Sequence, residues 1–171
     1  MTLLRPVLLS TVALVGLFAS SDAQAARFYF TVENVGNGLC IDVPGFYSGA
    51  TWVQQYSCNN GHNQYWQFVT NANGYIEIDN LSSGLCLEFP GWSTANHQPL
   101  QQYPCNGGSN QEWTKVDLGS GEFALVNRYS GKCLDVAGGS TSSGYYLQQY
   151  SCHYGPNQRF EYGPIGISIS H

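Results

Sequence analysis

A carboxylate, an amide and a tyrosine recur three times beside pairs of cysteines in this 171-residue chain. The stretches GLCIDV, GLCLEF and GKCLDV are each followed by one of the close copies VQQYSC, LQQYPC and LQQYSC. A carboxylate accepts hydrogen bonds, an amide both donates and accepts them, and a tyrosine has an apolar ring face with a polar tip. These groups suit the binding of a polar, uncharged ligand.

The six cysteines recur at nearly equal spacing, two in each copy. An even number of cysteines in a chain whose N-terminal residues predict export favours disulfides over thiol chemistry or a metal cluster. The economical pairing joins Cys40 to Cys58, Cys86 to Cys105 and Cys133 to Cys152. Six cysteines allow other connectivities, so the sequence leaves those open.

The cysteines also suggest how the polar groups face one another. If the two cysteines of a copy lie directly opposite on an antiparallel hairpin, side chains two residues away share their face. Gln54 then lies on the cysteine side. The same register places Asp42 opposite Tyr56, Glu88 opposite Tyr103 and Asp135 opposite Tyr150.

Internal repeats indicate which elements position these groups. The triplets Gln64-Tyr65-Trp66, Gln111-Glu112-Trp113 and Gln158-Arg159-Phe160 are evenly spaced. They divide the chain into three copies at about 28–70, 74–117 and 121–163. Each copy contains four short strand patterns bounded by Gly, Asn, Ser and Pro, and no helical period. We therefore predict an all-β fold closed around a pseudo-threefold axis, which removes exposed strand edges. Trp66, Trp113 and Phe160 are expected in its core.

The recurring Cys-x-Asp, Gln-x-Tyr-x-Cys and Asn-Gln-x-Trp patterns resemble those of the ricin B-type lectins and the related family 13-like carbohydrate-binding modules. The resemblance extends from about Phe30 to Tyr162. It implies a β-trefoil with one sugar site per repeat, the repeats being named α, β and γ. The aspartate is implied to bind sugar hydroxyls, the tyrosine to stack on the sugar ring, and the Asn-Gln pair to complete the polar contacts. The implied site residues of the first and third repeats are Asp42, Gln54, Tyr56, Asn63 and Gln64, and Asp135, Gln148, Tyr150, Asn157 and Gln158.

The second repeat departs from this pattern because a glutamate replaces the aspartate. Its corresponding residues are Glu88, Gln101, Tyr103, Asn110 and Gln111. We expect this site to be weak or silent, since the longer side chain pushes its carboxylate into the space of the sugar ring. Structural roles are the alternative at all three sites. The QxW glutamines can bond the backbone between repeats, the tyrosines can form cross-strand pairs, and the aspartates can cap loops.

The N-terminal segment predicts export. Met1 to Arg5 is positively charged, an apolar run follows, and Ala23-Gln24-Ala25 has the pattern of a cleavage site. We therefore expect a signal peptide at 1–25, a mature domain at 26–171, secretion, and no membrane span. A glycosylation sequon, Asn80-Leu81-Ser82, has meaning only in a eukaryotic secretory host.

Composition and spacing argue against other functions. Charged residues are 10% of the chain and its formal net charge is -5, so we expect no nucleic-acid partner. The histidines are scattered, and we expect no metal, no cofactor and no catalytic site. The expected partner is a galactose- or xylose-type sugar in a polysaccharide or glycoconjugate. Two alternatives are a non-catalytic targeting subunit of a toxin or glycosidase, with a separate catalytic subunit, and a trefoil that inhibits another protein.

Overall fold

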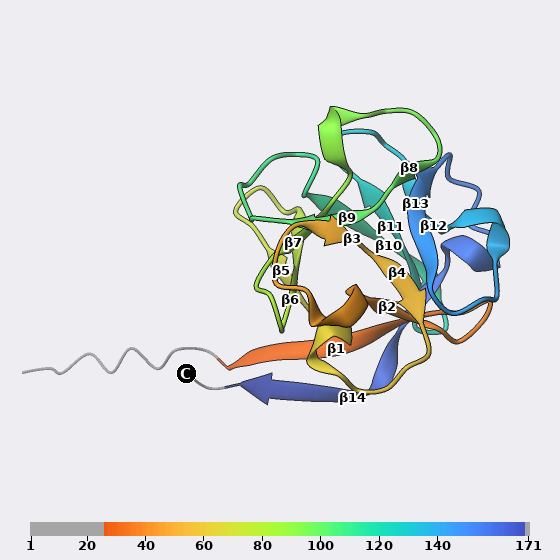
Figure 1. The fold of residues 1–171 in the computed structure, drawn as a ribbon. Helices are drawn as coiled ribbons and strands as arrows, with labels where there is room; N and C mark the ends of the chain where they lie inside the picture. Colours follow the sequence, from red (N-terminus) through yellow and green to blue (C-terminus); the bar gives the residue numbers. More distant parts are fainter. Residues whose placement is uncertain (1–25, 170–171) are drawn as a thin grey trace, which may run out of the picture.

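The computed structural model describes residues 26–169, so the predicted signal peptide lies outside the described range. The described chain forms fourteen β-strands and five short 3-10 turns, which confirms the all-β prediction (Figure 1). The turns are η1 (Pro44–Phe46), η2 (His62–Gln64), η3 (Pro90–Trp92), η4 (Ala137–Gly139) and η5 (Pro156–Gln158). None of the helices between residues 26 and 169 is long and apolar enough to cross a membrane.

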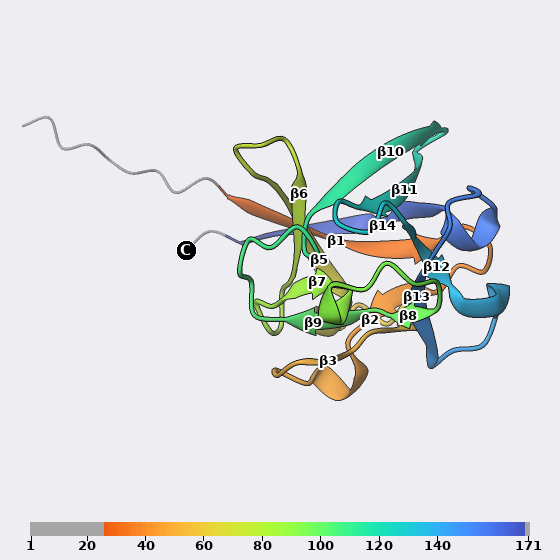
Figure 2. The same cartoon turned by 90° about the horizontal axis from the view of Figure 1, so that it is seen from above.

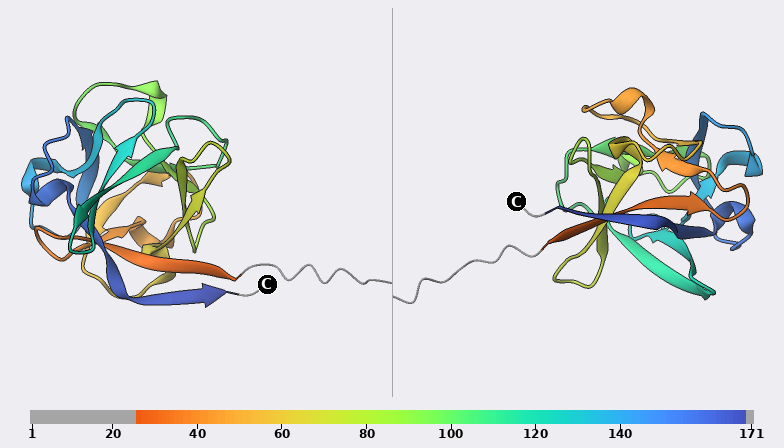
Figure 3. Two further views of the ribbon diagram at one scale, coloured as in Figure 1. Left: turned by 180° about the vertical axis from the view of Figure 1, so that it is seen from behind. Right: turned by 90° about the horizontal axis from the view of Figure 1, so that it is seen from below.

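Six strands, two from each repeat, pair in a closed antiparallel ring. In ring order they are β1 (Arg27–Asn34), β5 (Tyr65–Thr70), β6 (Ile76–Asn80), β10 (Trp113–Gly119), β11 (Glu122–Asn127) and β14 (Phe160–Ile169). The ring makes a barrel, and closure pairs the strand edges that a flat sheet would expose. The first and last strands of the ring, β1 and β14, lie side by side, with Arg27 opposite Ile169 (Figure 3).

Three hairpins form a second layer on the barrel. Each pairs the strand that begins at the first cysteine of a repeat with the strand that precedes the second cysteine. They are β2 (Cys40–Asp42) with β4 (Gln54–Tyr56), β7 (Cys86–Glu88) with β9 (Gln101–Tyr103), and β12 (Cys133–Val136) with β13 (Tyr145–Tyr150). Figure 2 shows the β10–β11 hairpin on one side of the molecule and the loop around β3 (Thr51–Trp52) on the opposite side.

Contacts between hairpins join the three repeats in a cycle. Strand β3 pairs with β9, β8 (Gln98–Pro99) pairs with β13, and the start of β13 pairs with β4. Three backbone hydrogen bonds complete the cycle, from Val53 N to Leu100 O (3.0 Å), Leu100 N to Leu147 O (2.8 Å) and Leu147 N to Val53 O (3.3 Å). This arrangement is a β-trefoil with pseudo-threefold symmetry.

The core repeats the same symmetry. Trp66, Trp113 and Phe160 have no exposed surface, as predicted. The indole N–H of each tryptophan is satisfied by a backbone carbonyl, that of Ile41 for Trp66 (3.0 Å) and that of Leu87 for Trp113 (3.2 Å). Buried aromatic rings with satisfied polar atoms supply much of the apolar burial that stabilises a small domain.

The second glutamine of each QQY motif joins one repeat to the next. Each is buried, and its Nε2 donates to two backbone carbonyls in the loop of a neighbouring repeat at 2.7 to 3.0 Å. Gln55 bonds Ser140 and Ser142, Gln102 bonds Tyr47 and Gly49, and Gln149 bonds Ser93 and Ala95. The first repeat thus bonds the third, the second bonds the first, and the third bonds the second. These bonds hold the loops where neighbouring repeats meet.

The three predicted disulfides are confirmed, with Cα–Cα distances of 5.0 to 5.2 Å. The predicted register is wrong by two residues, because Asp42 lies opposite Gln54, Glu88 opposite Gln101 and Asp135 opposite Gln148. The tyrosines instead lie opposite the first cysteines. The reason is that β4 ends at Tyr56, so Cys58 bonds from beyond the paired strands. A shift of two residues keeps every side chain on its predicted face.

Candidate functional site

The first repeat gathers three amides around one carboxylate. Oδ1 of Asp42 accepts a hydrogen bond from Nε2 of Gln54 (2.8 Å). Its Oδ2 accepts bonds from Nδ2 of Asn63 (2.8 Å) and Nε2 of Gln64 (2.9 Å). Strand β2 supplies the aspartate, β4 the first glutamine and turn η2 the Asn-Gln pair. A carboxylate has about four lone-pair positions, so this one retains acceptor capacity on Oδ1.

The second and third repeats have the same connections. The Glu88 carboxylate accepts from Gln101 (2.6 Å), Asn110 (3.1 Å) and Gln111 (2.8 Å). The Asp135 carboxylate accepts from Gln148 (2.8 Å), Asn157 (2.7 Å) and Gln158 (3.0 Å). Glu88 thus keeps its carboxylate in the amide network despite the extra methylene. The structure brings together the polar residues that the sequence assigned to each site.

The QxW glutamines lie beneath the carboxylates. Gln64, Gln111 and Gln158 have no exposed surface. Each also donates from Nε2 to a backbone carbonyl and accepts on Oε1 from the backbone N–H five residues before it, which for Gln64 are Ser57 O and Asn59 N. Gln64 and Gln158 thus support the carboxylates from beneath, and their direct contact with a sugar stays a prediction. Asn63 and Asn110 are nearly as buried.

The first carboxylate borders an open hollow of about 260 Å³. Two aromatic side chains line it, Tyr56 (42% exposed) from β4 and Phe46 (54% exposed) from η1. Polar side chains of Asp42, Gln54 and Asn63 line it as well. The hollow therefore combines hydrogen-bonding atoms with exposed aromatic faces, which is the combination that a pyranose ring with polar edges and apolar C–H faces requires.

The backbone at Phe46 is unusual. Gly45 and Phe46 both have positive φ angles, 61° and 57°. The corresponding residues of the third repeat are Gly138 and Gly139, with φ angles of 63° and 62°. A left-handed conformation costs a bulky residue roughly 1–2 kcal/mol, whereas glycine adopts it freely. The equivalent residue of the second repeat, Trp92, is also bulky and left-handed (φ 51°). Strain of this kind is characteristic of ligand sites.

The third hollow, of about 210 Å³, is lined by different side chains. Asp135, Gln148, Tyr150 and Asn157 occupy the predicted positions. Two histidines join them, His153 from the same repeat and His97 from the second repeat. Burial raises the pKa of the Asp135 carboxyl above its ordinary value, an effect that its amide hydrogen bonds and the two imidazoles oppose.

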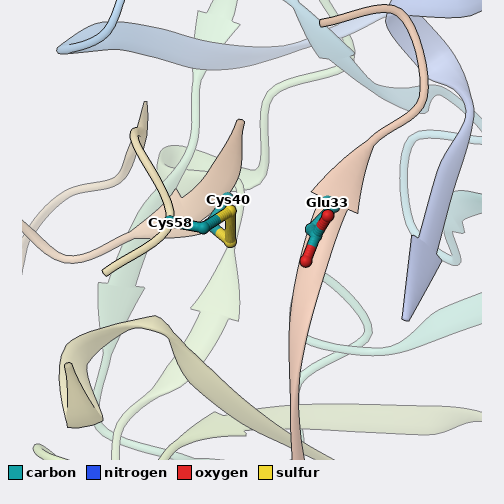
Figure 4. Close-up of side chains that lie close together, drawn as sticks. All are labelled: Glu33, Cys40 and Cys58. Carbon is teal, nitrogen blue, oxygen red and sulfur yellow. A yellow bond between two sulfur atoms is a disulfide. The ribbon is translucent and has the colours of Figure 1, made fainter. Parts of the chain in front are cut away.

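Glu33 lies beside the first disulfide (Figure 4). One carboxylate oxygen of Glu33 and the sulfurs of Cys40 and Cys58 lie within 4.8 Å of one another, which is close enough for metal ligands. Both sulfurs are bonded to each other and offer no thiolate, so this cluster lacks the ligands of a zinc site. Metal-independent binding remains a prediction.

The sequon at Asn80 is inaccessible in the folded chain. Asn80 is 1% exposed, and its Nδ2 donates to the carbonyls of Asn63 (3.1 Å) and Tyr65 (3.3 Å). The side-chain nitrogen that would carry a glycan is therefore committed to holding the turn that presents the first site's amides.

Sequence reasoning did not assign three lining residues. It gave no role to Phe46, and it did not place His97 or His153 in any site. The spacing itself offered a signal, because Phe46 follows Asp42 by the same interval as Gly139 follows Asp135. His97 gave no such signal, since it reaches the third hollow from another repeat.

Comparison with known proteins identifies the fold family. The model of the ricin-type β-trefoil lectin domain-like family matches residues 18–103, 62–150 and 109–169. A search of curated proteins finds no match. Among solved structures, a designed threefold-symmetric protein, ThreeFoil, is 37% identical with a TM-score of 0.77, and the match covers 81% of this chain and 99% of the design.

Two natural proteins are also similar. An exo-β-1,3-galactanase from Clostridium thermocellum is 32% identical with a TM-score of 0.74, over 80% of this chain and 30% of the enzyme. The hemolytic lectin CEL-III is 29% identical with a TM-score of 0.68, over 81% of this chain and 30% of the lectin. This chain thus spans less than a third of either natural protein.

Proposed function

Because the chain belongs to the ricin-type β-trefoil lectin family, we propose that it is a secreted lectin whose first and third hollows each bind one sugar residue. The observation that carries this proposal is the repeated carboxylate, held by three amides at the bottom of an aromatic-lined hollow. A carboxylate fixed by three donors is already oriented before a ligand arrives, so little entropy is lost on binding.

The contacts follow from the chemistry of the lining groups. The acceptor capacity left on Oδ1 of Asp42 and of Asp135 takes a hydroxyl hydrogen of the sugar. Tyr56 and Phe46 cover the apolar faces of the ring in the first hollow, and Tyr150 does so in the third. Gln64 and Gln158 hold the carboxylates in place from beneath. The Glu88 carboxylate has the same three amide partners, so weaker binding at the second site stays a prediction that rests on the replacement of aspartate by glutamate.

A galactose-type sugar is the first candidate ligand. The similarity to part of an exo-β-1,3-galactanase at 32% identity supports it. A xylose-type sugar is the alternative, and both present the vicinal hydroxyls and apolar ring face that the hollows suit. We propose that binding is non-catalytic, because each hollow has a single carboxylate, whereas glycoside hydrolysis needs a pair about 5–10 Å apart.

A second candidate function is that of a targeting subunit for a separate catalytic or toxic protein. Its support is that the similar segments form 30% of the galactanase and 30% of the hemolytic lectin. A trefoil that inhibits another protein is the remaining candidate. The sequence of the N-terminal segment supports secretion in each case, and sequencing the N-terminus of the exported protein tests the predicted cleavage after Ala25.

A glycan array tests the proposal. The wild-type chain is applied beside a variant with both Asp42→Asn and Asp135→Asn, which retains amide-bonding side chains at both positions. We expect wild-type signal on galactosides, or on xylosides in the alternative, and little signal from the double variant. An array without signal from the wild-type protein favours the inhibitor function and contradicts the lectin proposal.

A further inference from the structure

The third site differs from the first in a residue that controls the turn before the Asn-Gln pair. In the first and second repeats this residue is an asparagine, Asn59 or Asn106, whose Oδ1 accepts a hydrogen bond from a glycine N–H two residues later (2.8 Å in both). In the third repeat it is His153, whose Nδ1 accepts the same bond from Gly155 N (3.0 Å). An uncharged acceptor at this position therefore shapes all three turns.

The bond to Gly155 determines the state of the imidazole. Because Nδ1 accepts a hydrogen bond, the neutral ring carries its proton on Nε2. Nε2 lies 3.7 Å from Oδ2 of Asp135. Protonation places a second N–H on Nδ1, directly against the Gly155 donor, and gives the ring a positive charge beside a carboxylate. The glycine bond is lost and the imidazolium is drawn onto Asp135.

Both consequences act on the sugar-binding groups. Loss of the glycine bond loosens the turn that leads into Asn157 and Gln158, the two amides that hold Oδ2 of Asp135. An imidazolium drawn onto Oδ2 also offsets the negative charge of Asp135, which weakens the bond that Oδ1 accepts from a ligand hydroxyl. Histidine is the side chain whose charge ordinarily changes between about pH 5 and 8.

His97 forms the opposite wall of the third hollow. Its backbone is left-handed (φ 68°), and its N–H donates to Gln149 O (2.9 Å). Its Nδ1 lies 3.2 Å from Oε1 of Gln148, and its ring meets the Tyr150 ring edge-on at 5.1 Å. This contact uses Nδ1–H as donor, so protonation of the other nitrogen leaves it intact.

Few other charged groups meet these histidines. Asp135 faces His153 from β12. Arg159 contacts the turn that contains His153 and Gly155, because its Nε donates to Tyr154 O (2.8 Å). Its Nη1 pairs with Glu122 (3.1 Å). Lys132 reaches Ser151 Oγ (3.5 Å), ahead of the turn. Arginine and lysine side chains ordinarily remain charged between about pH 5 and 8. Burial raises the pKa of Asp135, so an experiment must distinguish an effect of Asp135 from one of His153.

We propose that His153 makes ligand binding by the third site pH-dependent, strong with the neutral imidazole and weakened on acidification, while the first site, which has Asn59, binds independently of pH over the same range. This inference rests on the proposed function of the hollows as sugar sites. The role of His153 follows from its bond to Gly155 and its position beside Asp135.

The test measures each site separately by calorimetry, with lactose and with xylobiose, at pH 7.5 and pH 5.5. An Asp42→Asn variant reports the third site, and an Asp135→Asn variant reports the first. We expect the affinity of the third site to fall at least about fivefold between the two pH values, and that of the first to change less than about twofold. The ratio between pH values is the readout, so a uniform loss of affinity in a variant does not affect it.

His153→Asn, added to the Asp42→Asn variant, copies the residue of the first site and leaves Asp135 free to titrate. The proposal predicts that this change removes the pH dependence and that His97→Ala does not. The proposal is overturned if the loss of third-site affinity at pH 5.5 persists in His153→Asn, a result that would assign the loss to Asp135. It is also overturned if the loss disappears only in His97→Ala. Absence of binding in every variant at both pH values instead contradicts the proposed function.

Discussion

Substitutions at Phe46 can distinguish the backbone strain that this residue imposes on the fold from the contribution of its ring to ligand binding. Phe46 is the second of two consecutive left-handed residues in η1, where the third repeat has Gly139. Two variants are needed. Phe46→Ala removes the ring and keeps the strained backbone, whereas Phe46→Gly removes both.

Both variants lack the ring, so their stabilities differ only through the conformational free energy of the backbone at residue 46. A left-handed alanine costs roughly 1–2 kcal/mol, and glycine forfeits roughly 0.5–1 kcal/mol through its freer unfolded state. We therefore expect Phe46→Gly to be more stable than Phe46→Ala by roughly 0.5–1 kcal/mol in the free energy of unfolding. Chemical denaturation of both variants, monitored by tryptophan fluorescence, measures this difference.

The loss of binding should be the same in both variants. A sugar that covers ~60 Å² of the half-exposed ring buries apolar surface worth about 1.5 kcal/mol, or about tenfold in affinity. Calorimetry in the Asp135→Asn background isolates the first site. Equal stability of the two variants would refute the strain argument, and wild-type affinity in Phe46→Gly would refute ring stacking. Gly139→Ala is the matched control and should lose stability without any change at the first site.

Three further outcomes are expected. Gln55→Ala should lower the free energy of unfolding by about 2–4 kcal/mol, because the buried amide of Gln55 donates to Ser140 and Ser142 of another repeat. Gln54→Ala, at a half-exposed side chain, should lower it by about 1 kcal/mol. Equal losses in urea denaturation would contradict the role of Gln55 in joining the repeats. Burial raises the pKa of Asp79 to about 6, so the folded state binds more protons than the unfolded state between about pH 4 and 6, and stability should fall as pH rises through this window. Asp79→Asn should then stabilise the protein at pH 7 by up to about 1 kcal/mol after solvent screening, and by nothing near pH 4; thermal unfolding at both pH values checks the sign, with Glu77→Gln as the control. Sugar binding should survive a chelator, since each site has one carboxylate already bonded to three amides, and calorimetry that shows loss of binding in EDTA would require a cation.

Repetition within the chain made most of the fold predictable. Even spacing of the QxW/F triplets identified three equivalent units, and equal cysteine spacing identified the disulfides that the structure contains. The carboxylate and its three amides could be grouped because they recur together. The register failed because a disulfide constrains the distance between two Cα atoms and not their pairing in a ladder.

Contacts between repeats could not be predicted in the same way. Gln55 binds a loop more than eighty residues away, and His97 reaches the site of another repeat. Period-two alternation places Gln54 and Gln55 on opposite faces of the strand, but it does not show that Gln55 is buried against the loop of another repeat. Only the closed arrangement of the three units decides which loop each side chain meets.

The measurement that tests the central claim most directly is calorimetric titration of a monovalent galactoside into the wild-type protein, Asp42→Asn, Asp135→Asn and the double variant. An asparagine oxygen in place of Oδ2 keeps the bonds from the Asn-Gln pair, and its amide nitrogen in place of Oδ1 is accommodated when the amide of Gln54 or Gln148 turns to accept from it. The charge-assisted bond to the ligand, worth about 1.5–3 kcal/mol, is lost. The affinity of the altered site should therefore fall by a factor of roughly 10–100. We predict two sites in the wild-type protein, one in each single variant and none in the double variant at concentrations that saturate the wild type. Two sites of unchanged affinity in the double variant would contradict the account.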